Sequence, residues 1–195
     1  KGEQVLFEHP IDKNEARQFI DWANQHFPQV SINLYSGKDW MTDHLDQWSQ
    51  EEARITGEKP HILPLLDPLL DTTKPLHKLL LIGNAEEIQA LYHTISTNDF
   101  PSTAFYLSKA NYLEVTAKHV SKEDALVELA NHYHLSLEEV LTMGDNFNDL
   151  PMLKKAGIGV AMGNAPQEVK DGAAVVTKTN NENGAGQAVE TYVLI

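Results

Sequence analysis

The 195-residue chain contains no cysteine, which excludes disulfide bonds, thiolate catalysis and thiolate metal sites. It also has no uninterrupted apolar run approaching the roughly 20 residues of a membrane-spanning helix. Its most leucine-rich stretch, residues 61–70, is broken by Pro64, Asp67 and Pro68. No secretory signal is recognisable. We therefore expect a cytoplasmic protein that does not associate with membranes.

Basic residues are scarce. Fifteen lysines and arginines stand against 28 aspartates and glutamates, which gives a net charge of −13. The sequence contains no basic stripe, so we do not expect nucleic acid as a partner. An anionic ligand would have to meet a local positive site, such as a metal ion together with a suitably placed lysine.

The chain is long enough to bury a core, and its two halves differ in pattern. The first half, to about residue 117, mixes strand-like and helix-like segments and is typical of an α+β unit. The expected strands are 30–35, 78–82, 103–107 and 112–116, and the expected helices are 15–26 and 84–95.

The second half alternates helix and strand regularly, which predicts a parallel sheet. Helices are expected from Ser121, from a start at Ser136 and Glu139, over 149–156, after Asn164 and from Ala185. Strands are expected over 140–143, 158–162 and 174–177.

A polar turn follows the predicted strand 140–143. Asp145 comes directly after the strand, and Asn148 and Asp149 open the next helix. Ligands bind at the carboxyl ends of parallel strands, and hard oxygen ligands of this kind suit Mg²⁺. The alternative is purely structural, with an aspartate at a strand end and an Asn-Asp helix cap.

Lys122 falls at the first position of a predicted helix, where the helix dipole disfavours a cation. A lysine is favourable there if it and the free N–H groups face an anion, although a solvated lysine would also fit. Together with the acidic turn, Lys122 predicts a site that offsets the charge of a phosphoryl group.

Three motifs in residues 113–177 carry a family resemblance. They are Val120–Ser121–Lys122, the GDxxND string Gly144–Asp149, and the G-x-A-M-x-N-A segment Gly159–Ala165. In order and spacing they resemble the haloacid dehalogenase superfamily, and more narrowly its Cof-type sugar-phosphatase branch. Glu123 departs from the glycine that usually follows the lysine in that family.

The resemblance implies an α/β fold with a partial Rossmann-like parallel core, formed by residues 1–15 and 118–195. Residues 16–117 would be an α+β cap inserted into that core. The parent activity would be hydrolysis of small phosphomonoesters, such as sugar phosphates, through an aspartyl-phosphate.

The resemblance also implies roles for four residues. Asp145 would bind Mg²⁺, and Lys122 and Asn148 would hold the substrate phosphate. Asp149 would support the metal shell and orient Lys122, so that Lys122 and Asp149 are the catalytic candidates. The expected partner is a small phosphorylated metabolite.

The nucleophile segment of that family, D-x-D-G-T, has no counterpart in the chain. Asp67 and Asp71 are no substitute, because no strand precedes them. The opening residues 1–6 resemble the segment just before the cap in longer relatives. We therefore expect a fragment that is inactive alone. A natural remnant, or a non-catalytic interaction module that associates through the open edge of strand 140–143, stays an alternative.

Histidine and tryptophan add little to this interpretation. The nine histidines are scattered, and His132 and His134 do not share a helix face, so we expect no histidine metal site. Trp22, Trp40 and Trp48 are predicted to lie in the core of the first half. Lining of a substrate entrance is the alternative for Trp40.

Overall fold

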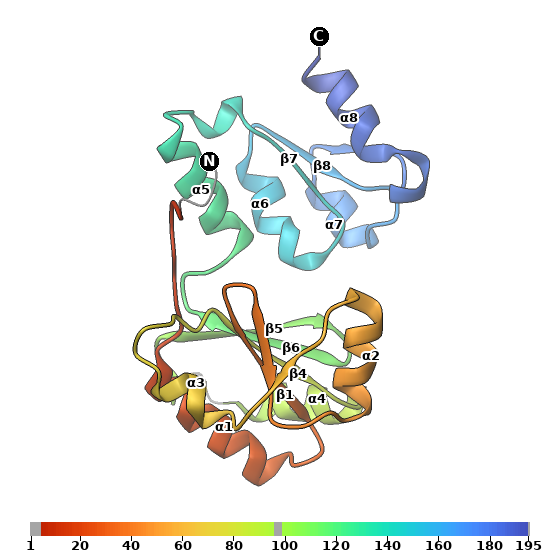
Figure 1. The fold of residues 1–195 in the computed structure, drawn as a ribbon. Coiled ribbons are helices and arrows are strands. Elements are labelled where there is room, and N and C mark those ends of the chain that lie inside the picture. The colour runs from red at the N-terminus through yellow and green to blue at the C-terminus, as the bar shows by residue number, and fades with distance from the viewer. Residues whose placement is uncertain (1–4, 96–98, 195) are drawn as a thin grey trace. The chain divides into compact units, whose positions relative to one another are not determined.

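The computed structural model describes residues 5–95 and 99–194. The chain divides into two compact units, Lys1–Val120 and Ser121–Ile195 (Figure 1). Residues 1–4 of the predicted core segment lie outside the described residues.

The first unit is built on a six-stranded sheet with the order β3-β2-β1-β4-β6-β5. Neighbouring strands run antiparallel, except that β2 and β3 are parallel. The strands are β1 (Ser31–Ser36), β2 (Asp39–Thr42), β3 (His61–Ile62), β4 (Lys78–Ile82), β5 (Thr103–Lys109) and β6 (Tyr112–Ala117). The four strands expected from the sequence are therefore confirmed, whereas β2 and β3 were not predicted.

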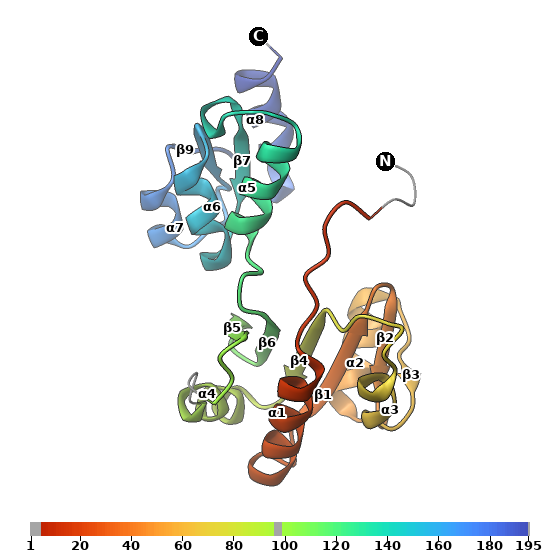
Figure 2. The same ribbon diagram turned by 90° about the vertical axis from the view of Figure 1, so that its left-hand side faces the viewer.

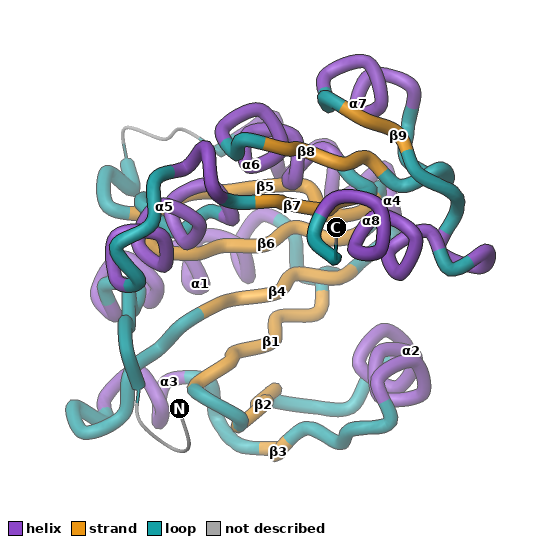
Figure 3. Tube along the Cα trace, turned by 90° about the horizontal axis from the view of Figure 1, so that it is seen from above, coloured by secondary structure: helices purple, strands orange, loops and turns teal. Residues whose placement is uncertain are grey.

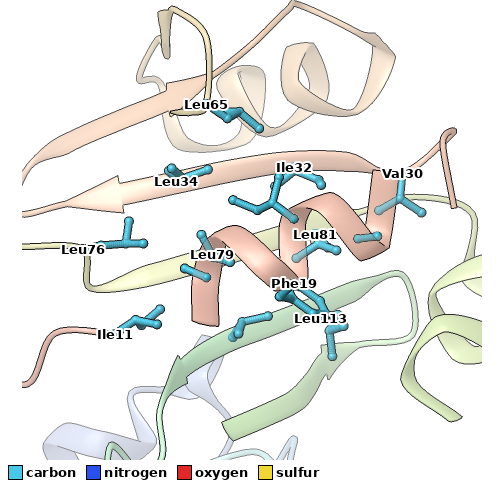
Figure 4. Packing of buried hydrophobic residues seen from close by; sticks show 14 of the residues in the cluster. Ile11, Phe19, Val30, Ile32, Leu34, Leu65, Leu76, Leu79, Leu81 and Leu113 are labelled. Atoms are coloured by element: carbon cyan, nitrogen blue, oxygen red, sulfur yellow. The ribbon is translucent and has the colours of Figure 1, made fainter. Parts of the chain in front are cut away.

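Three helices cover one face of this sheet: α1 (Lys13–His26), α3 (Leu66–Leu70) and α4 (Ala85–Thr94), as Figures 1 and 2 show. Alternate strand residues point to this face and meet the apolar sides of the helices. Together they form the apolar core of the first unit, in which Phe19 of α1 is fully buried (Figure 4). Other members are Ile32, Leu34, Leu79, Leu81, Leu113, Val115, Ile88 and Leu91.

The opposite face carries a fourth helix, α2 (Gln47–Thr56), which the sequence did not predict. Trp48 of α2 packs against Leu80 and Ile82. The hydroxyl of Tyr112 in β6 donates to Oε2 of Glu52 at 2.6 Å, and both residues are buried. A polar contact therefore fastens α2 to the sheet.

Trp40 is buried on the same face, with 5% of its surface exposed. Its indole N–H donates to Oδ1 of Asn33 at 2.9 Å, and its ring stacks on Tyr35. Trp22 and Trp48 are partly buried against apolar clusters. The prediction that the tryptophans belong to the core of this unit agrees with these positions.

The first helix begins two residues earlier than expected, because Asp12 caps it. Its carboxylate accepts the backbone N–H groups of Asn14 and Glu15, each at 2.9 Å. Ile11 is buried in the core of this unit, and its N–H donates to the carbonyl of Leu76 at 2.7 Å. Residues 11–15 therefore pack within the first unit. The division into core segments 1–15 and 118–195 and a cap 16–117 stays a prediction.

The second unit contains a three-stranded parallel sheet with the order β7-β8-β9 (Figure 3). Its strands are β7 (Leu141–Gly144), β8 (Ile158–Ala161) and β9 (Val175–Val176). Its helices are α5 (Lys122–His132), α6 (Leu150–Lys155), α7 (Gln167–Gly172) and α8 (Gly184–Tyr192), with 3₁₀ turns at Leu137–Glu139, Phe147–Asp149 and Asn180–Glu182. The predicted α/β alternation is confirmed.

The core of the second unit is small. Leu153 of α6 and Val169 of α7 pack against Ala161 at the end of β8 and against Ala165. Among the described residues, β7 pairs only with β8, so its other edge has no strand beside it. No helix in the described part of the chain is long and apolar enough to cross a membrane.

Candidate functional site

The turn after β7 is organised around the buried carboxylate of Asp149, whose side chain is 4% exposed. Its Oδ2 accepts the backbone N–H groups of Asp145 at 2.9 Å and of Asn146 at 3.0 Å. Gly144 makes this approach possible, because a Cβ there would overlap the Cβ of Asp149 and lie 2.8 Å from its Oδ2. The turn therefore depends on both Gly144 and Asp149.

Lys122 brings a positive charge to the same turn. As predicted, it is the first residue of a helix, and the hydroxyl of Ser121 caps that helix by accepting the N–H of Asp124 at 3.0 Å. The Lys122 ammonium donates to Oδ1 of Asp149, while half of its side chain is exposed. The anion that faces Lys122 within the chain is therefore the carboxylate of Asp149.

Asp145 and Asn148 are both exposed at this turn. Oδ2 of Asp145 accepts a hydrogen bond from Nδ2 of Asn164 at 3.0 Å. The turn after β7 thus contains Asp145, Asn148 and Asp149, and Lys122 of α5 reaches it through Asp149. The roles predicted for these four residues stay predictions.

Asn164 was not among the predicted site residues. It follows β8, and its side chain reaches the turn that follows the neighbouring strand β7. Because adjacent parallel strands end at the same sheet edge, a polar residue just after each strand was the available signal. That signal predicted Asp145, and Asn164 has the same position relative to β8.

Glu123, the acidic neighbour of Lys122, is paired elsewhere. Its carboxylate accepts from the Lys155 ammonium at 2.7 Å. The hydrogen bond to Glu123 and the charge of that carboxylate raise the pKa of Lys155. The extra negative charge beside Lys122 is therefore offset by a cation of α6.

The donor set at this turn fits a partial Mg²⁺ site. Mg²⁺ is commonly held by one or two carboxylates, waters and substrate phosphate oxygens, and Asp145 supplies one exposed carboxylate. The described residues include no group of three histidine, aspartate or glutamate side chains that could enclose a metal. Asp145 is thus the residue that would hold the ion, and Asp149 is occupied by three hydrogen bonds.

The comparisons with known proteins agree with the motifs. The family model for haloacid dehalogenase-like hydrolases matches residues 1–189. A Haemophilus influenzae protein named "Putative phosphatase" is 39% identical over 164 residues, which is 84% of this chain and 60% of that protein. The 5-amino-6-(5-phospho-D-ribitylamino)uracil phosphatase YcsE of Bacillus subtilis is 41% identical over 87 residues, which is 45% of this chain and 35% of that protein.

A solved structure shows the same arrangement of elements. The haloacid dehalogenase-like hydrolase from Bacteroides thetaiotaomicron matches with a TM-score of 0.84 and 29% identity, covering 97% of this chain and 70% of that chain. The chain spans 60% of the length of the Haemophilus relative. On its motifs, its fold and the family match over residues 1–189, the chain belongs to the haloacid dehalogenase-like hydrolases, in the Cof-type branch.

Proposed function

We propose that this chain provides the metal-binding and phosphate-binding side of a Mg²⁺-dependent phosphatase that hydrolyses small phosphomonoesters through an aspartyl-phosphate. The observation that carries the proposal is the turn after β7. There the exposed carboxylate of Asp145 follows β7, and the buried Asp149 of the same turn pairs with the ammonium group of Lys122.

Each residue contributes differently to such a reaction. Lys122 presents a positive charge to a phosphoryl oxygen, and Asn148 offers an uncharged amide in the same turn. Asp149 keeps Lys122 in position by an ion pair that is buried on the carboxylate side. Asp145 would hold Mg²⁺, which when bound would offset negative charge on the phosphoryl group.

The substrate class follows from the family. YcsE is named for a phosphorylated ribityl compound. The net charge of −13 on this chain would repel a large polyanion. A small phosphorylated metabolite, such as a sugar phosphate, fits both observations. The cytoplasmic location stays a prediction, as does the absence of a nucleic-acid partner.

No D-x-D segment occurs in these 195 residues. We therefore expect that the chain alone releases no phosphate from a panel of phosphorylated metabolites with Mg²⁺ present. Mg²⁺-dependent turnover by the purified chain, abolished by Asp145→Ala, would contradict this part of the proposal.

If the DNA upstream of Lys1 encodes an in-frame D-x-D-G-T segment, the activity itself is tested in the longer product that contains it. There Lys122→Ala should lower kcat by about 10²–10³-fold, the usual cost of removing one group that stabilises a developing oxyanion. The matched control is Lys154→Ala, which removes an exposed lysine of α6. Equal losses in the two variants would contradict the role given to Lys122.

A second candidate function is a non-catalytic interaction module that uses the open edge of β7. One observation favours it: β7 pairs only with β8 among the described residues, and Leu129 of α5 and Tyr133, which follows α5, are exposed. Such an edge pairs readily with another strand, including that of a second copy. Light scattering should then give a dimer mass, and a monomer at every concentration would contradict self-association.

Met143→Pro tests the edge directly. The carbonyls of Val140 and Gly144 accept hydrogen bonds from the N–H groups of Ile158 and Met162. Because backbone groups alternate in direction along a strand, those of Leu141 and Met143 point to the open side of β7. A proline at 143 removes one outward N–H and should dissociate the dimer. Circular dichroism checks that the variant is folded, and a folded variant that stays dimeric would contradict pairing through β7.

A further inference from the structure

Asn164 joins two parts of the second unit through the two ends of one amide group. Nδ2 donates to Oδ2 of Asp145 at 3.0 Å, and Oδ1 accepts the backbone N–H of Asn180 at 3.0 Å. We propose that Asn164 is a positioning residue that holds the Asp145 carboxylate in place to ligate a divalent cation. This inference rests on the proposed function, since it gives Asp145 the role of metal ligand.

The two partners fix the orientation of the amide. A backbone N–H can only donate, and an ionised carboxylate can only accept. Oδ1 must therefore face Asn180, and Nδ2 must face Asp145. A rotation of the amide by 180° would lose both hydrogen bonds at once, so the donor is directed to the carboxylate without further help.

The backbone around Asn164 is anchored on two sides. The N–H of Met162 donates to the carbonyl of Gly144 at 2.9 Å, and the N–H of Gly163 donates to the carbonyl of Lys178 at 2.9 Å. A Cβ at Gly163 would lie 2.8 Å from the backbone of Lys178, so the two segments touch closely. The amide is thus carried by a segment whose position is set at the end of β7 and by residues 177–180.

The contact leaves Asp145 suited to a cation. Only Oδ2 of its carboxylate accepts a hydrogen bond from the described residues, and Oδ1 stays available. The donor is a neutral amide, so the carboxylate keeps its full negative charge. A lysine or arginine in the same place would form a salt bridge and compete with the metal ion for that charge.

Two variants separate this role from a general effect on folding. Asn164→Ala removes the donor to Asp145. Asn180→Pro removes the backbone N–H that orients the amide, together with an exposed side chain. Proline is tolerated at the first position of a helical turn, and Thr179 before it is already extended, at φ −68° and ψ 164°, as the residue before a proline must be.

Gln167→Ala is the matched control. Gln167 also donates an amide hydrogen to a carboxylate, that of Asp171 at 2.7 Å, and it does so on α7 away from Asp145. Mg²⁺ alone is the probe. It is titrated into the purified chain, and the amide NMR signals of residues 144–149 report binding. Thermal unfolding in EDTA reports folding separately.

We expect Asn164→Ala to weaken Mg²⁺ binding about tenfold, the usual lower cost of losing a partner that orients a metal ligand. Asn180→Pro should weaken it several-fold, and Gln167→Ala should not change it, with all three unfolding near the wild-type temperature. Wild-type Mg²⁺ affinity in a folded Asn164→Ala variant would overturn this inference but would leave the proposed metal site intact. A wild-type chain whose 144–149 signals do not respond to Mg²⁺ would overturn the proposed metal site, and the inference with it.

Discussion

The ammonium group of Lys122 donates to the buried carboxylate of Asp149, which lies 27 positions further along the chain. The other oxygen of that carboxylate accepts two backbone N–H groups of the turn after β7. A buried charge costs free energy unless it is paired and hydrogen-bonded. Among the described residues, Lys122 and the backbone of the turn supply these partners. One carboxylate thus both builds the turn and brings the lysine to it.

Because Asp149 has both of these contacts and Lys122 has one of them, we expect substitutions at the two residues to lower stability unequally. Asp149→Ala should lower the free energy of unfolding by about 2–4 kcal/mol, because it leaves two N–H groups without an acceptor and removes the ion pair. Lys122→Met should cost about 1–2 kcal/mol, since the lysine is half exposed and solvent screens the pair. Urea denaturation measures both values.

The control for this prediction is Lys155→Met. Its partner Glu123 is 34% exposed, so the pair lies at the surface, and its loss should cost less than about 1 kcal/mol. If Asp149→Ala proved no more damaging than Lys155→Met, Asp149 would not be the residue that organises the turn.

Gly144→Ala should disrupt the same turn from the backbone side. The added methyl group would overlap the Cβ of Asp149, so the carboxylate must move away from the N–H groups that it accepts. We expect a loss of about 2–3 kcal/mol, in the upper range for a forced shift in a packed site. Lys122 should become more exposed to solvent, which chemical modification of lysines detects by mass spectrometry.

Gly83→Ala provides the comparison for Gly144→Ala. The nearest atom to a Cβ at Gly83 is a side-chain methyl of Val30 at 3.2 Å, which can give way. Its cost should therefore be the smaller of the two. A Gly144→Ala variant that is as stable as Gly83→Ala would show that the close approach to Asp149 is not required.

The parts of the fold with a strong local pattern could be predicted from the sequence. The strand over 78–82 and the helix capped by Asn84 match the structure, because a buried apolar run and a capping residue are both visible locally. The turn at 144–149 was recognised for a similar reason, since its residues are contiguous. The ion pair between Lys122 and Asp149 came from the family resemblance rather than from spacing.

Elements that depend on distant partners could not be predicted. The helix α2 has a polar, charged sequence, and its hydrogen bond to the sheet comes from Tyr112, which is 60 positions away from Glu52. Asn164 was missed in the same way, because its partners Asp145 and Asn180 lie on other segments. The burial of Ile11 was missed for the same reason, because it depends on Leu76 and the core around it.

The contact that holds α2 gives the last prediction. Burial and the hydrogen bond to Glu52 raise the pKa of Tyr112, which favours the protonated hydroxyl that donates to Glu52. Tyr112→Phe keeps the ring but leaves the buried Glu52 carboxylate without that donor. We expect a loss of about 1–3 kcal/mol and faster hydrogen exchange in residues 47–56.

Tyr92→Phe is the matched control for Tyr112→Phe. Tyr92 is half-buried against the main apolar cluster, and its hydroxyl forms no hydrogen bond with the described residues. Its loss should change stability by less than about 0.5 kcal/mol, with exchange in α2 unaltered. If Tyr112→Phe behaved like Tyr92→Phe, the packing of Trp48 against Leu80 and Ile82 would be sufficient to hold α2, and the buried Glu52 would need no partner from the sheet.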